Sequence, residues 1–222
     1  GEGTLEAVST AVDCEEKQVV VMQADGSYQT ASYLLLKDGT AVIEVAQSSG
    51  LQQIPLEKRN PFTATSFGTG EVIHDAINNG ATKIVIGLGG SACNDGGAGM
   101  LQALGGVLYD NENNVLGTGN QSLGEITHAD FTNLPTKLQN IPIDIITDVN
   151  NPLLGKTGAT YIFGKQKGAT IDDFPVLDHN IKCFADVVEK QLGHEYRNNV
   201  GSGAAGGIGF ALQTLNKKVK IY

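Results

Sequence analysis

A glycine-rich segment is the feature that most constrains the fold of this chain. It begins after the apolar, β-branched run Lys83–Leu88 (KIVIGL), which is typical of a buried strand, and it ends in the helical pattern Gly97–Leu104. Glycines at a strand-to-helix turn let the backbone approach an anion closely, and the dipole of the following helix adds to the attraction. The segment therefore predicts a ligand-binding loop that contains Gly89, Gly90, Ser91, Asn94, Gly96 and Gly97.

Three polar side chains in this segment indicate chemistry beyond a turn. Ser91 and Asn94 are neutral hydrogen-bond donors, and Asp95 is a carboxylate of the kind that binds Mg²⁺ or accepts a proton. The alternative is a tightly packed structural turn. The accumulation of glycines together with these three side chains favours a ligand role.

The remaining patterns predict a single α/β domain that extends over residues 1–222. Three β-like runs come first, and the Asp25-Gly26 and Asp38-Gly39 dipeptides between them are strong hairpin signals, so the chain opens as an antiparallel meander. Alternating strand and helix patterns follow, which favours a mixed sheet flanked by helices. The expected strands are Lys17–Ala24, Tyr28–Leu36, Thr40–Ala46, Lys83–Leu88 and Ile141–Thr147, with a hairpin between Val107–Tyr109 and Val115–Leu116; the expected helices are Thr4–Val12, Glu71–Asn79, Gly97–Leu104, a long helix within Ile171–Leu192, and Ser202–Leu215.

Composition excludes several kinds of partner. The formal net charge of −9 repels DNA, RNA and anionic lipid, so neither a nucleic acid nor a membrane surface is expected as a partner. The 3 cysteines are far apart and form no C-x-x-C, which indicates a reducing compartment and no zinc site. No signal peptide is visible and no run approaches ~18 apolar residues, so we expect a cytoplasmic protein.

A second loop, Thr147–Gly155, follows the last strong strand pattern. Ligands of α/β sheets collect beyond the carboxyl ends of strands. Asp148 and Asn150 are therefore expected to contact a ligand if that strand is central in the sheet. An Asx-rich turn with Asp148 as a cap explains the same residues, and the local sequence leaves both interpretations open. Gly155-Lys156-Thr157 imitates the end of a P-loop, but Asn150 stands where that motif requires its first glycine, so any ATP site is built differently.

Two more loops are rich in glycine. In Phe163–Gly168, Lys165 and Lys167 either supply positive charge to an anion or remain solvated surface lysines. Gly201–Gly209 matches G-x-G-x-x-G, but no clear strand precedes it. We interpret this last segment as a second anion-facing helix start rather than as a dinucleotide fingerprint.

An NAD-dependent oxidoreductase of a small hydroxy acid is a rival interpretation. Gly87, Gly89 and Ala92 satisfy G-x-G-x-x-A, and Asp110 lies ~20 residues further on, where a ribose-binding acid is expected. The β-meander ahead of the strand and the hairpin-like turn around Asp110 count against this interpretation. A non-catalytic domain that binds a small anion is a third hypothesis.

The segments resemble one known family. Gly87–Gly105 (GLGGSACNDGGAGMLQALG) looks like the signature of bacterial glycerate kinases, whose usual form reads GSATNDGGAGM, with Cys93 in place of the threonine. In the segment Phe163–Ala169, Lys165 stands where the family has a proline. Further segments are similar to motifs of that family in order and spacing, so that the resemblance covers essentially the whole chain: Gly1–Thr4, Thr65–Glu71, Asp148–Gly155, Phe163–Ala169 and Gly201–Gly207.

The resemblance implies a function and a set of site residues. It implies transfer of the γ-phosphate of ATP, with Mg²⁺, to a hydroxyl of D-glycerate, with 2-phosphoglycerate as the product. Asp95 or Asp148 would act as base or metal ligand, and Lys167 would neutralise charge in the transition state. It also implies that residues 1–222 are the central part of a two-domain kinase, whose other half is built from flanking segments. The substrate- or nucleotide-binding residues would be Gly89, Gly90, Ser91, Asn94, Gly96, Gly97, Asn150, Gln166, Gly203 and Gly206.

Overall fold

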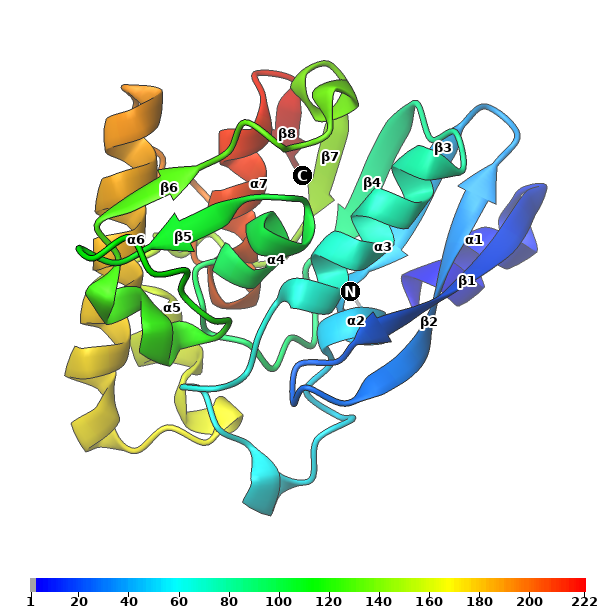
Figure 1. Ribbon diagram of the computed structural model, residues 1–222. Helices are drawn as coiled ribbons and strands as arrows, with labels where there is room; N and C mark the ends of the chain where they lie inside the picture. The colour runs from blue at the N-terminus through cyan, green and yellow to red at the C-terminus, as the bar shows by residue number, and fades with distance from the viewer. Residues whose placement is uncertain (1–2) are drawn as a thin grey trace.

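A mixed β-sheet organises the structure (Figure 1). The computed structural model describes residues 3–222 and contains, within that range, a six-stranded sheet in the order β1-β2-β3-β4-β7-β8 and a two-stranded sheet of β5 and β6. This arrangement confirms the predicted α/β class with a mixed sheet. The strands are β1 (Cys14–Met22), β2 (Tyr28–Leu36), β3 (Thr40–Glu44), β4 (Lys83–Gly87), β5 (Val107–Tyr109), β6 (His128–Asp130), β7 (Ile143–Ile146) and β8 (Val219–Ile221).

The first three strands form the predicted antiparallel meander. β1 pairs with β2 over its whole length, and β2 pairs antiparallel with β3. Both turns contain the expected glycine, and Gly26 and Gly39 have positive φ angles of 86° and 84°. Glycine adopts this backbone region without the Cβ clash that other residues meet, so the two Asp-Gly dipeptides fix where the chain reverses.

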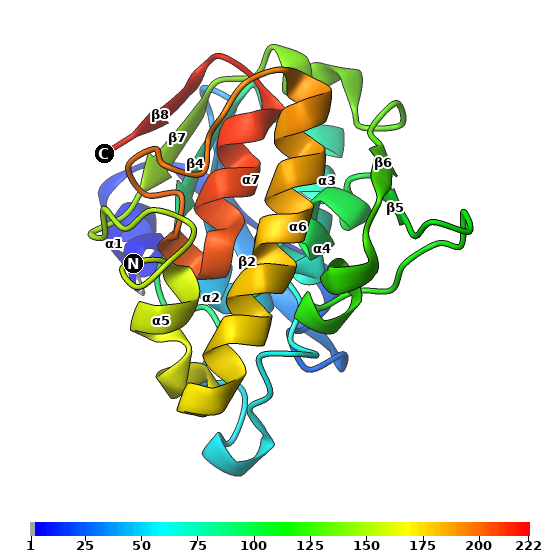
Figure 2. The ribbon, with the colours of Figure 1, turned by 90° about the vertical axis from the view of Figure 1, so that its left-hand side faces the viewer.

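From β3 onward the neighbouring strands run parallel, and this explains where the helices lie. β3, β4, β7 and β8 follow one another in the same order in the sheet and in the chain. Right-handed crossovers that all advance in one direction place their helices on one face of the sheet. Figures 1 and 2 show α3, α4 and α7 on that face, α6 packed outside them, and α1 on the opposite side of the sheet.

The helices of residues 3–222 are short, apart from two. α3 and α6 are the long ones, and none of the helices in this range combines the length and the apolarity that a membrane span requires. Short 3-10 turns join several of the helices. The helices are α1 (Thr4–Ala11), α2 (Val45–Ser49), α3 (Phe67–Asn78), α4 (Ala98–Ala103), α5 (Ala159–Phe163), α6 (Phe174–Leu192) and α7 (Ile208–Leu215).

The central strand β4 is buried on one face only. Ile84 and Ile86 point into the core and are fully buried, whereas Val85 between them keeps partial exposure. On the face of Val85, Asp144 of the neighbouring strand β7 forms an ion pair with Lys83 at 2.6 Å. The continuous apolar run therefore indicated more burial than the strand has, because the crossover helices cover a single face of this part of the sheet.

Several short elements differ from the expectation. The predicted hairpin between Val107–Tyr109 and Val115–Leu116 is present only as one antiparallel bridge, Tyr109 to Val115, with Leu116 N–H donating to the Leu108 carbonyl at 2.8 Å. The strand that pairs with β5 over its whole length is β6, which the sequence did not predict. The long helix begins at Phe174, after a 3-10 turn at Ile171–Asp173. The sequence pattern carries no signal for α2, α5, β6 or β8, because elements of three to five residues are too short for a period to show.

Candidate active site

A cavity of about 250 Å³ lies beyond the carboxyl ends of β4 and β7. Four loops form its wall: the glycine loop (residues 87–99), the aspartate loop (147–155), the lysine loop (163–168) and the C-terminal glycine loop (201–209). Neighbouring parallel strands deliver their carboxyl ends to one edge of the sheet, so loops distant in sequence meet there. The lining residues are Leu88, Gly89, Gly90, Ser91, Asp148, Val149, Phe163, Gln166, Lys167, Ala205 and Gly206.

The glycine loop presents unpaired backbone donors to this cavity. Within residues 3–222, the N–H groups of Gly89, Gly90 and Ser91 donate no hydrogen bond to another protein group. The loop itself is held, because the N–H of Leu51 donates to the carbonyl of Gly90 at 2.7 Å. Gly90 has a φ of 68°, a backbone region that glycine adopts without strain, and Gly89, Gly90 and Ser91 all line the cavity. A fixed loop with free N–H groups favours the binding of an anion.

Lys167 is a buried lysine in the wall of the cavity, not a solvated surface lysine. Its side chain is 2% exposed, and Nζ donates to Ser91 Oγ at 3.0 Å and to the Cys93 carbonyl at 2.6 Å. Burial lowers the pKa of Lys167, and the nearby Cys93 and Asp95 oppose that shift. The lysine thus joins the glycine loop to the lysine loop and brings positive charge next to the free amides.

Only one of the two lysines of the lysine loop is buried. Lys165, Gln166 and Lys167 form a 3-10 turn that ends at Gly168, whose φ is 100°. The turn is fixed from outside, since Arg59 Nη1 donates to the carbonyl of Gln166 at 3.0 Å. Lys165 is exposed on the outer side, while the Gln166 side chain is exposed and lines the cavity.

Asp95 lies outside the cavity wall and supports the glycine loop. Its carboxylate is fully buried and accepts from the Ser66 N–H (2.8 Å) and hydroxyl (2.9 Å), and from the N–H groups of Gly97 (3.1 Å) and Gly99 (3.3 Å). Burial raises the pKa of Asp95, and these hydrogen bonds oppose the shift. With its oxygens used in this way, the geometry argues against Asp95 as catalytic base or metal ligand.

Several other residues of the predicted site also lie behind the wall. Asn94 is fully buried, and its Nδ2 donates to Thr160 Oγ1 at 3.0 Å, while its Oδ1 has no partner among the described residues. Gly96 N–H donates to the Gly206 carbonyl at 2.9 Å, which ties the two glycine-rich loops together. The residues of the predicted site that do not line the cavity are Asn94, Asp95, Gly96, Gly97, Asn150 and Gly203.

The C-terminal glycine loop has an unusual backbone. Ala205, Gly206 and Gly207 have consecutive positive φ angles of 52°, 66° and 99°, which no right-handed helix accommodates. The helix expected over Ser202–Leu215 is therefore wrong at its start, and α7 begins only at Ile208. A Cβ on Gly206 would collide with the Cys93 carbonyl, so glycine is required for this loop to reach the glycine loop.

Asp148 is the acidic residue among the lining residues of the described chain, and it is exposed. It follows directly after β7, whose central place in the sheet brings the aspartate loop to the cavity. Within residues 3–222, no group of three or more His, Cys, Asp or Glu side chains is arranged to hold a metal ion. Any cation here would need oxygens from a ligand in addition to the Asp148 carboxylate.

Sequence reasoning missed the remaining lining residues, Leu88, Val149, Phe163 and Ala205. Apolar and small residues in loops carry no local signal that separates a cavity wall from ordinary core packing. They form the non-polar part of the wall between the amides, the lysine and the carboxylate.

The dinucleotide interpretation finds no support in this geometry. Asp110 accepts from the N–H groups of Glu112 (2.8 Å) and Asn114 (2.9 Å), so it closes a tight turn. That turn follows β5, which belongs to the small two-stranded sheet and not to the parallel part of the large one. Asp110 is therefore not at the end of a second parallel strand, where a ribose-binding acid is required.

The fold and the cavity together indicate the general class of this protein. The α/β fold, the free amides and the buried lysine beyond the carboxyl ends of parallel strands are features shared with domains that bind small anionic ligands. The sequence profile described as the Glycerate kinase family matches residues 1–221. The chain belongs to the glycerate kinase family.

Individual relatives agree with this assignment. The chain is 46% identical over 215 residues to "Glycerate kinase" of Bacillus subtilis (strain 168), covering 96% of this chain and 56% of that protein. It is 46% identical over 216 residues to "Glycerate 2-kinase" of Escherichia coli (strain K12), covering 97% and 57%. A crystal structure described as a glycerate kinase 2 from Salmonella typhimurium LT2 superposes with a TM-score of 0.96 at 40% identity, over 100% of this chain and 59% of that one. The chain thus spans little more than half the length of these relatives.

Proposed function

We propose that this chain forms part of a kinase that transfers the γ-phosphate of ATP to a hydroxyl of D-glycerate, with 2-phosphoglycerate as the product. The observation that carries the proposal is the pairing of free amides at Gly89, Gly90 and Ser91 with the buried ammonium of Lys167 in one cavity. Phosphoryl transfer depends on positioning and on neutralising charge on oxygens, and these groups supply both. The names of the similar proteins support the same reaction.

The size of the cavity indicates which part of the reactants it holds. At about 250 Å³ it lies below the ~300–1,000 Å³ of sites that bury a drug-sized ligand. We infer that it takes glycerate and the terminal phosphate, and that the rest of the nucleotide lies outside it. On this proposal, the amides and Lys167 bind oxygens of the carboxylate or of the phosphoryl group.

Asp148 is the proposed base of the reaction. It is an exposed carboxylate in the cavity wall, so it can reach a hydroxyl that Asp95, buried behind the wall, cannot reach. The same carboxylate would hold a Mg²⁺ ion that takes its other ligands from phosphates and water. Bound there, Mg²⁺ would neutralise charge on the phosphate oxygens. On this proposal, Gln166 of the lysine loop, which also lines the cavity, donates to a substrate oxygen.

Steady-state kinetics of the complete protein test this assignment. We expect Asp148→Asn to lower the turnover number at least ~10²-fold, because the base is lost while the fold is retained. Asn150→Ala is the matched control, since Asn150 is exposed in the same loop but does not line the cavity. A turnover number of Asp148→Asn within tenfold of the wild type would refute the assignment of Asp148 as the base. ³¹P NMR of the product separates 2- from 3-phosphoglycerate, and titration with NAD in place of ATP–Mg²⁺ tests the rival class.

A further inference from the structure

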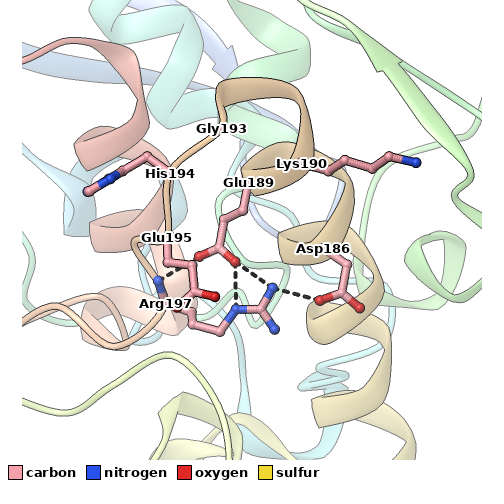
Figure 3. Close-up of a pocket in the computed structure, with 7 residues that line it drawn as sticks. All are labelled: Asp186, Glu189, Lys190, Gly193, His194, Glu195 and Arg197. Carbon is pink, nitrogen blue, oxygen red and sulfur yellow. Dashed lines mark hydrogen bonds and ion pairs between the residues drawn. The ribbon is translucent and has the colours of Figure 1, made fainter.

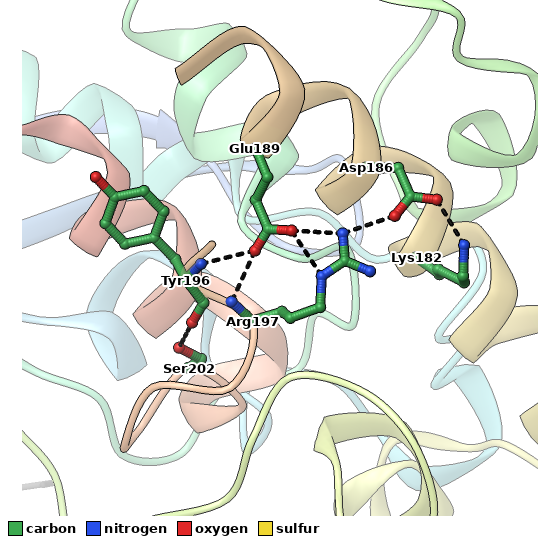
Figure 4. Close-up of polar contacts among 6 residues, drawn as sticks. All are labelled: Lys182, Asp186, Glu189, Tyr196, Arg197 and Ser202. Carbon is green, nitrogen blue, oxygen red and sulfur yellow. Dashed lines mark hydrogen bonds and ion pairs between the residues drawn. The ribbon is translucent and has the colours of Figure 1, made fainter. Parts of the chain in front are cut away.

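A cluster of charged side chains lies at the carboxyl end of α6, outside the candidate active site. Glu189 is 6% exposed, and donors surround its carboxylate (Figure 4). One oxygen accepts from the N–H groups of Tyr196 (2.7 Å) and Arg197 (2.8 Å). The other accepts from Arg197 Nε (2.6 Å) and Nη2 (2.5 Å). A buried carboxylate with this many charge-assisted bonds fixes the Tyr196–Arg197 segment relative to α6.

The fixed segment in turn holds two loops of the candidate active site. The carbonyl of Arg197 accepts from the Leu153 N–H at 2.8 Å, in the aspartate loop. The carbonyl of Tyr196 accepts from the Ser202 hydroxyl at 2.6 Å, at the start of the C-terminal glycine loop (Figure 4). Both loops contribute lining residues to the cavity. A displacement of this segment would therefore move two parts of the cavity wall.

The two loops are also bonded to each other. The Gly203 N–H donates to the Asn151 carbonyl at 2.9 Å, and a Cβ on Gly203 would collide with the Pro152 carbonyl. The two loops are therefore in direct contact at Gly203. Glu189 anchors the Tyr196–Arg197 segment, and through it both loops, to the long helix α6. Asp178 of the same helix accepts from the Gly155 N–H at 3.1 Å and holds the aspartate loop alone.

The hollow beside this cluster does not explain why its charged side chains are bonded to one another. Figure 3 shows the hollow, of about 530 Å³, with the His194 and Lys190 side chains directed away from the ion pair. The Glu189 carboxylate is bonded to the Arg197 guanidinium, and the guanidinium is also bonded to Asp186. No buried polar atom of Glu189 or Arg197 is left to bind a ligand among the described residues.

We propose that Glu189 is a positioning residue for the candidate active site, a role that rests on the proposed kinase function. Its carboxylate sets the place of Tyr196 and Arg197, and these set the separation between Asp148 in one loop and Gly206 in the other. Catalysis of group transfer is sensitive to displacements of about 1 Å, which cost up to ~10²-fold in rate. The effect of Glu189 on the reaction thus passes through the backbone of the two loops.

Glu189→Gln and Asp186→Asn form a matched pair for the test. Both change one carboxylate on α6 that pairs with Arg197, but Asp186 accepts only from side chains and makes no bond to the Tyr196–Arg197 backbone. In Glu189→Gln an amide N–H₂ faces the guanidinium donors, so we expect the segment to shift. Amide hydrogen exchange of the complete protein without ligands should show at least tenfold faster exchange at Leu153 and Gly203 in Glu189→Gln only.

Kinetics supply the readout that a merely structural role would not change. Turnover is measured per folded molecule at a temperature well below the unfolding temperature of each variant. We expect the turnover number of Glu189→Gln to be about tenfold below that of the wild type, and that of Asp186→Asn to stay within threefold of the wild type. Ser202→Ala is a milder second variant, and it should loosen Gly203 while Leu153 keeps its protection. Equal exchange at Leu153 and Gly203 in the two carboxylate variants would overturn the proposal. Hydrogen exchange can be measured whether or not the protein is active. A wild-type protein without kinase activity would therefore refute the proposed function and leave the exchange test of Glu189 intact.

Discussion

Replacing Lys167 by methionine tests the charge in the cavity wall. Methionine fills a similar volume without the ammonium, and it removes the bonds to Ser91 Oγ (3.0 Å) and to the Cys93 carbonyl (2.6 Å). A preorganised donor at developing negative charge is worth about 10²–10³-fold in turnover. We therefore expect Lys167→Met to lower the turnover number by that factor in a steady-state kinase assay of the complete protein.

The same substitution has a pH-dependent effect on stability. Because burial holds the pKa of Lys167 below its ordinary value of 10.5, the folded state binds fewer protons than the unfolded state between these two values. The free energy of unfolding of the wild type should therefore rise relative to Lys167→Met as the pH rises through this window. Each pKa unit of lowering corresponds to about 1.4 kcal/mol. Urea unfolding of both proteins at a series of pH values up to about 10.5 measures the difference.

Lys165→Met is the control for both measurements. Lys165 belongs to the same 3-10 turn but is exposed, so its replacement should leave turnover and the pH dependence of stability close to those of the wild type. Turnover of Lys167→Met within tenfold of the wild type would refute the role in charge neutralisation. A free-energy difference that stays level or falls with rising pH would refute the burial argument.

Two further expectations concern residues that hold the loops of the cavity in place. Gly206→Ala should lower the free energy of unfolding by about 2 kcal/mol or more in urea titrations, because it adds a clash with the Cys93 carbonyl to a φ of 66°; Gly155→Ala, at a φ of 81° with open space around it, should cost only about 1 kcal/mol, and equal losses would contradict the packing argument. Asp95→Asn should lower the free energy of unfolding by about 3 kcal/mol, because an amide N–H₂ meets backbone donors that the carboxylate now accepts; a stable variant with low turnover would instead return Asp95 to the catalytic residues.

The sequence predicted much of the fold from local signals. The Asp-Gly dipeptides placed both hairpin turns, and the glycine-rich segment correctly followed a strand and preceded a helix. It also selected the four loops that meet at the cavity. Three were selected from their glycines, which mark places where the backbone approaches something closely, and the aspartate loop was selected from its position after a strand. The sequence failed for β6 and β8, whose three residues pair with distant strands and show no period of their own.

Burial of individual side chains was decided by the tertiary structure alone. Lys165 and Lys167 have nearly the same neighbours in sequence, yet one is exposed and the other lies in the cavity wall. Asp95 and Asp148 were equal candidates as base, and only the fold places one under the glycine loop and the other in the wall. The physical reason is that charge, hydrogen bonding and access depend on atoms that distant segments bring together, whereas turns and strands depend on the conformational preferences of adjacent residues.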